Sequence, residues 1–147
     1  MRSPNASVGA LRSLAAEAPL VIRVRGDCMA PGLPDGAAVE IAPARRYWPG
    51  DVVAFGSAPE QLTLHRVIGW RLKGQRLVVL TQADSGASAD SPIVPAAIVG
   101  RVLGVVGANG ALSALTPRRR LALRRWLSHL AAAVTRRLKR PGGSKGA

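Results

Sequence analysis

The feature that most constrains the fold is a change in the spacing of apolar residues near residue 116. Before this point, apolar residues come in short runs rich in β-branched side chains, and glycine or proline separates the runs. This pattern predicts β-strands joined by turns. After this point, leucines recur at helical spacing. We therefore expect a mainly β body followed by a helix.

Six segments of the body have the pattern of strands. They are residues 19–25, 37–42, 52–56, 61–72, 75–82 and 97–107. Lys73-Gly74 and Asn109-Gly110 are expected to form turns, and the first of these closes a hairpin between residues 61–72 and 75–82. A short helix is expected over residues 7–17. The predicted organisation is a helical segment (1–18), a β-rich domain (19–115), and a basic amphipathic helix with a disordered tail (116–147).

Composition limits the classes of protein to which the chain can belong. The 147 residues are 48% hydrophobic, enough for one domain with a modest core. A single cysteine excludes an internal disulfide and a cysteine-based zinc site, and we expect no cofactor. No apolar run approaches the length of a spanning helix, and no signal peptide is evident. We therefore expect a location in the cytoplasm or on the periphery of the inner membrane.

The net charge of +13 is concentrated in the C-terminal segment. Residues 117–147 contain ten Lys and Arg and no acid. Thr116-Pro117 resembles a helix N-cap followed by proline, and the apolar residues that follow predict one face of a helix: Leu123, Trp126, Leu127, Leu130, Val134 and Leu138. Residues 117–140 could lie on an anionic membrane surface or dock on the body. The body has no helix-turn-helix pattern, which disfavours nucleic acid as the partner.

Two side chains of the body suggest nucleophilic chemistry. Cys28 lies in "VRGDCMAPGLPDG", a turn directly after an apolar run, and His65 lies within the strand 61–72. A cysteine nucleophile needs a base, and imidazole, with a pKa of about 6.5, is suited to that role. Imidazole can also stabilise the thiolate, which predicts a thiol pKa below its usual value of about 8.5. Asp84 or Asp90 could orient His65. A packing role for both Cys28 and His65 is the simpler alternative.

Four segments taken in order resemble the sequence boxes of the type I signal peptidase superfamily, which also contains self-cleaving SOS-type repressors. They are "GDCMAPGLPDGAAVEI", "YWPGDVVAF", "LHRVIG" and "TQADSGASADSPIVPAAIVGRVLGVV". The resemblance covers residues 21–106. In the first box Cys28 stands where the family has its nucleophilic serine. The membrane anchor typical of a signal peptidase is not recognised.

This resemblance implies a catalytic domain of coiled antiparallel sheets and a set of roles. His65 stands at the position of the base, which is histidine in the archaeal and endoplasmic-reticulum branch. Asp84 and Asp90 resemble two acids of that branch, and the Gly-Asp box favours Asp84 as the residue that orients His65. The strand before Cys28 and the strand around Phe55 would pair with an extended substrate. The substrate-binding residues implied are Gly26, Asp27, Met29, Pro31 and Phe55.

The function expected from these observations is endopeptidase activity with a Cys–His dyad. The substrate would be an extended peptide or precursor protein of the leader or signal type. The alternative is an inactive module that keeps the peptidase fold and binds a peptide.

Overall fold

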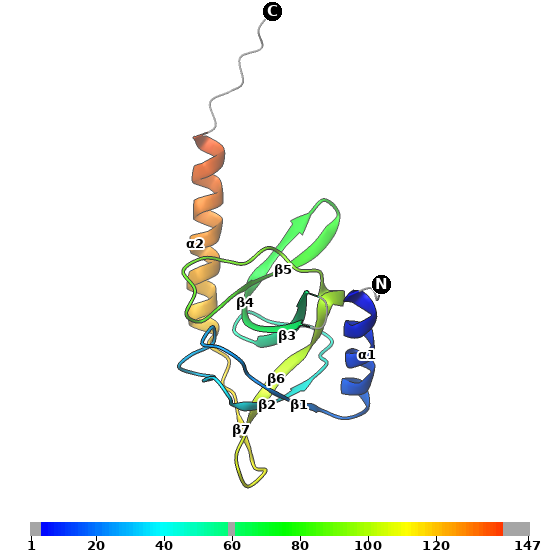
Figure 1. The fold of residues 1–147 in the computed structure, drawn as a ribbon. Helices are drawn as coiled ribbons and strands as arrows, with labels where there is room; N and C mark the ends of the chain where they lie inside the picture. Colours follow the sequence, from blue (N-terminus) through cyan, green and yellow to red (C-terminus); the bar gives the residue numbers. More distant parts are fainter. Residues whose placement is uncertain (1–3, 59–60, 140–147) are drawn as a thin grey trace, which may run out of the picture.

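The computed structural model describes residues 4–58 and 61–139. It confirms a mainly β protein with a helix at each end (Figure 1). The elements are α1 (Pro4–Glu17), β1 (Leu20–Arg23), β2 (Ala38–Ala42), β3 (Val52–Ala58), β4 (Gln61–Lys73), β5 (Arg76–Gln82), the 3-10 turn η1 (Pro95–Ala97), β6 (Ile98–Val106), β7 (Leu112–Ala114) and α2 (Arg119–Leu138).

The strands form one antiparallel sheet in the order β1-β2-β6-β3-β4-β5, with β7 paired to β6. All six expected strands are present, and the hairpin between β4 and β5 turns at Gly74, whose φ is +63°. The Asn109-Gly110 turn is also confirmed, because it joins β6 to β7. Strand β7 was not predicted, since its three residues are too few to produce an alternating pattern.

The sheet carries a core on each face because β3 is buried on both sides. Val52 and Ala54 pack into one cluster with Met29 and Leu64, which α1 covers through Val8. The alternate residues of β3, among them Val53 and Phe55, pack into a second cluster. Successive side chains of a strand point to opposite faces, so one central strand supplies both cores.

Helix α2 begins later than the sequence pattern indicated. Its N-cap is Arg118, with no side-chain capping bond, so the expected cap at Thr116 is wrong. The helix docks on β4 through Ala122, which is fully buried, and through Trp126, whose indole lies against Gly69 and Trp70. Trp126 therefore belongs to the docked side of the helix. The C-terminal half of α2 lies beside the tip of the β4–β5 hairpin.

Neither helix of the described chain is long and apolar enough to cross a membrane. The disordered tail predicted at the C-terminus includes residues 140–147, which lie outside the described residues.

Candidate active site

Cys28 is held in a tight turn that follows β1. Gly26 has a φ of +81°, a conformation that favours glycine, and its N–H donates to the Asp35 carboxylate at 2.8 Å. The N–H of Ala30 donates to the carbonyl of Asp27 at 3.0 Å. Met29 is fully buried and fixes the turn to the core. Met29 is therefore an anchor of the turn, and the substrate contact implied for it stays a prediction.

The thiol of Cys28 faces the start of β4. Sγ donates a hydrogen bond to the Leu64 carbonyl at 3.7 Å, next to His65 in the chain. Burial raises the pKa of Cys28, and hydrogen bonds from the backbone N–H groups of Cys28 and Met29 oppose that rise. The expected lowering of this pKa is therefore wrong. Desolvation disfavours the thiolate, and a carbonyl acceptor stabilises the protonated thiol.

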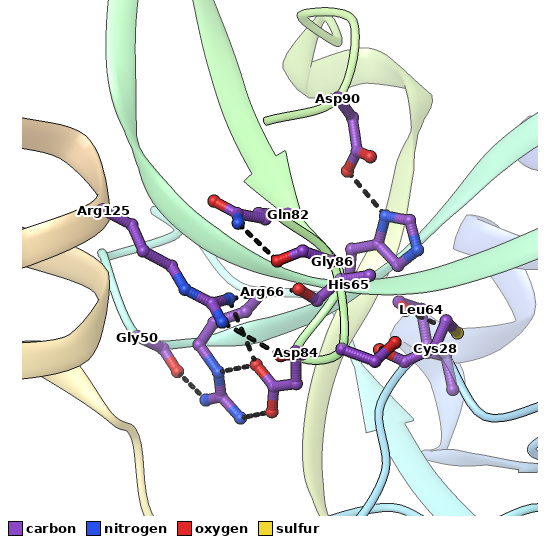
Figure 2. Close-up of polar contacts among 12 residues, drawn as sticks. Cys28, Gly50, Leu64, His65, Arg66, Gln82, Asp84, Gly86, Asp90 and Arg125 are labelled. Carbon is purple, nitrogen blue, oxygen red and sulfur yellow. Dashed lines mark hydrogen bonds and ion pairs between the residues drawn. The ribbon is translucent and has the colours of Figure 1, made fainter. Parts of the chain in front are cut away.

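His65 is oriented by Asp90 (Figure 2). Its Nδ1 lies 2.6 Å from Oδ2 of Asp90, and the Thr81 hydroxyl donates to the same oxygen at 2.8 Å. An Nδ1–H that donates to the carboxylate leaves Nε2 with its lone pair, as a general base requires. In Figure 2, Nε2 is on the side of the ring turned toward Cys28, although no hydrogen bond joins the two among residues 4–58 and 61–139.

Phe55 supports the His65 ring and does not pair with a substrate. The two rings meet edge to face with centroids 5.9 Å apart. Strand β3 is paired with β4 on one side and β6 on the other, so its backbone is already occupied at Phe55. The expectation that this strand pairs with a substrate is therefore wrong.

Asp84 has a structural role, and the preference for it as the residue that orients His65 is wrong. Both of its oxygens accept from Arg66, at 2.7 Å each, in a pair that is almost fully buried. Arg66 also donates to the Gly50 carbonyl at 2.7 Å, and Arg125 of α2 lies 3.8 Å from Asp84. Spacing along the chain could not distinguish Asp84 from Asp90, because both lie in the same loop.

A chain of contacts connects α2 to the Cys28 turn, and the sequence analysis did not identify it. Arg125 donates to the carbonyls of Ala83 and Asp84 at 3.1 and 2.9 Å. The next residue, Ser85, donates to the Cys28 carbonyl from its N–H at 3.1 Å and from its hydroxyl at 3.2 Å. Thr81 and Ser85 lie in the segment that begins "TQADSG", but no pattern in the sequence marks either residue as part of the site.

A groove of about 630 Å³ leads to Cys28 between β1 and the start of β4. Its lining residues are Ile22, Arg23, Val24, Arg25, Cys28, Gln61, Leu62, Thr63 and Leu64. In the part of the chain that the structure describes, β1 is an edge strand, and β4 pairs with β5 only from Arg66 onward. The groove therefore lies between two strand edges that have no other strand partner there.

The ladder bonds show which backbone groups face this groove. The backbone N–H and C=O of Val67 form hydrogen bonds with Asp51 and Gly50, on the β3 side of β4. Successive residues of a strand direct these groups to opposite edges, so Leu62 and Leu64 direct theirs to the edge away from β3. Val24 bonds toward β2, so the alternate positions of β1, including Arg23, direct theirs away from β2. Both edges can accept hydrogen bonds from a peptide and donate hydrogen bonds to it.

Within residues 4–58 and 61–139, no group of three or more His, Cys, Asp or Glu side chains is placed to hold a metal ion. Comparison of the chain with protein-family models, with curated proteins and with solved structures finds no match.

Proposed function

We propose that this protein is an endopeptidase of the signal-peptidase type, with Cys28 as nucleophile and His65 as general base. One observation carries the proposal: Cys28 lines a groove between two unpaired strand edges, directly beside the strand that holds the His65–Asp90 pair. The order of the four sequence boxes, with Cys28 and His65 at the nucleophile and base positions, supports the same assignment.

The groove favours an extended peptide as substrate. A peptide strand between β1 and β4 would form main-chain hydrogen bonds with both edges, as in β-strand addition. Such bonds are independent of sequence, so selectivity would come from the side chains that line the groove. Arg23 and Arg25 belong to that lining and favour an acidic or neutral side chain beside them.

The chemical steps use Cys28, His65 and Asp90. Sγ of Cys28 attacks the scissile carbonyl carbon while Nε2 of His65 takes the thiol proton. Asp90 keeps Nδ1 as the donor and stabilises the imidazolium that forms. The tetrahedral intermediate collapses when His65 returns the proton to the leaving amine, which leaves a thioester on Cys28. Water, deprotonated by His65, then hydrolyses the thioester and restores the thiol.

Two backbone donors are available for the oxyanion. The N–H groups of Cys28 and Met29 are directed at the thiol and donate to no backbone carbonyl in the described chain. A tetrahedral oxyanion formed at Sγ would lie near both of them. Because burial raises the pKa of Cys28, the resting thiol is protonated at neutral pH. Proton transfer to His65 must therefore accompany the attack.

The test measures labelling of Cys28 by an extended peptide that carries a thiol-reactive group. General-base catalysis contributes about 10²–10⁴-fold, so His65→Gln should slow labelling at least about 100-fold, and Asp90→Asn should slow it less. His129→Gln, which changes the other histidine of the chain, is the matched control. Cys28→Ala should abolish both labelling and cleavage of a peptide library. Labelling that is indifferent to His65 would refute the proposed dyad.

The raised pKa of Cys28 and its bond to the Leu64 carbonyl favour a second candidate, a peptide-binding module without turnover. This candidate predicts saturable binding of an extended peptide that does not depend on His65, with no cleavage by the wild-type protein. Peptide binding together with cleavage would exclude it.

A further inference from the structure

The apolar face of α2 is largely exposed. Its side chains, which we call the leucine stripe, are Leu123, Leu127, Leu130, Val134 and Leu138, with exposed fractions from 41% to 81%. The helix is attached to the body on a different side, through Ala122 and Trp126. Docking on the body and an exposed apolar stripe therefore coexist in this helix.

The tip of the β4–β5 hairpin extends the same apolar surface. Leu72 and Leu77 are directly paired across the hairpin and are 70% and 52% exposed. A depression of about 560 Å³ lies between this tip and α2, and its lining includes Leu72, Leu130 and Val134. Two elements distant in sequence thus present apolar side chains around one depression.

Basic side chains surround this surface. Arg71, Lys73 and Arg137 line the same depression. By helical geometry, Arg120 and Arg137 flank the leucine stripe on opposite sides. Residues 117–147 contain no acidic side chain. The surface therefore combines a continuous apolar strip with a basic rim, which is the composition of a helix that lies in a lipid interface.

We infer that α2 and the β4–β5 hairpin tip together dock on an anionic lipid surface. The leucine stripe and Leu72 would enter the boundary between headgroups and acyl chains, and the arginines would contact the lipid phosphates. A nucleic acid would match the charge but leave the leucines exposed to water. A second copy of this chain would match the leucines but bring two basic rims together.

The test uses the full chain and vesicle flotation, and it needs no enzymatic activity, so its outcome is separate from that of the peptidase proposal. We expect binding to phosphatidylcholine vesicles that contain phosphatidylglycerol, no binding to phosphatidylcholine alone, and weaker binding as salt rises. The double variant Leu130→Ser/Val134→Ser should weaken binding at least about tenfold, because two apolar side chains no longer leave water.

Leu112→Ser is the matched control, since Leu112 is 44% exposed but lies in β7. Thermal melts of both variants report whether the fold is kept, and exposed positions should leave the melting temperature unchanged. Three results would overturn the inference: no binding to anionic vesicles, equal loss of binding in Leu112→Ser, or a wild-type dimer that the double variant dissociates. If a polynucleotide still displaces the protein from vesicles when the protein is the double variant, the basic rim is assigned to nucleic acid.

Discussion

Replacing Asp84 and Asp90 in turn should separate the carboxylate of a buried ion pair from the more exposed carboxylate beside His65. Asp84 forms a bidentate ion pair with Arg66, and the side chains of Asp84 and Arg66 are only 4% and 2% exposed. Removing one partner of such a buried pair costs about 3–5 kcal/mol, because the other charge is left uncompensated. Asp90 is 30% exposed and accepts from His65 and Thr81, so its loss should cost about 1–2 kcal/mol.

At about 3 °C per kcal/mol for a domain of this size, Asp84→Ala should lower the melting temperature by about 9–15 °C and Asp90→Ala by about 3–6 °C. Circular dichroism melts, with urea unfolding to confirm a constant m-value, measure both. The double variant Arg66→Met/Asp84→Leu should be more stable than Asp84→Ala, because it leaves no unpaired charge in the core. Equal losses in Asp84→Ala and Asp90→Ala, or no recovery in the double variant, would refute this reading of the buried pair.

Three further predictions concern the thiol, the docking of α2 and a glycine in α1. Because burial raises the pKa of Cys28, the rate of alkylation by iodoacetamide should rise with pH through an inflection above the ordinary value of about 8.5. In urea the inflection should return to that value, and an inflection below it in the folded protein would contradict the structure. A Cβ at Gly69 would lie 2.5 Å from the Trp126 indole, so Gly69→Ala should destabilise the protein by about 1–3 kcal/mol and speed proteolysis of α2. At Gly9 an added Cβ would meet no atom within 4 Å apart from the backbone of its own helix, so Gly9→Ala should instead stabilise α1 by up to about 1 kcal/mol.

The strands were predictable because their signal is local. Alternation and β-branched residues between glycine and proline turns located all six expected strands, from β1 to β6. The start of α2 was not predictable in the same way. Thr116 has the chemistry of an N-cap, but Leu115 still donates its N–H to the Leu103 carbonyl, so the chain is held against β6 at that point. Tertiary pairing overrides a local capping preference.

Composition and the resemblance selected Cys28, His65, Asp84 and Asp90, but the sequence did not show which of these side chains pair with one another. Which aspartate faces His65 depends on the path of the loop after β5. The N–H of Asp90 donates to the Thr81 carbonyl at 2.8 Å, which returns the loop to the end of β5 and places Asp90 beside the ring. A sequence contains no local signal for such a return.

The contacts of α2 connect the proposed lipid surface to the proposed nucleophile. Arg125 fixes the carbonyls of Ala83 and Asp84, and Ser85 fixes the carbonyl of Cys28. The N–H groups of Cys28 and Met29 must be aimed within a few tenths of an ångström for an oxyanion to benefit. A helix that holds this loop from outside the β-rich domain therefore acts on the geometry of the turn that contains the proposed nucleophile. If lipid docking orders α2, the same contacts would transmit that order to the turn that contains Cys28, because the loop between them is short and hydrogen-bonded at both ends.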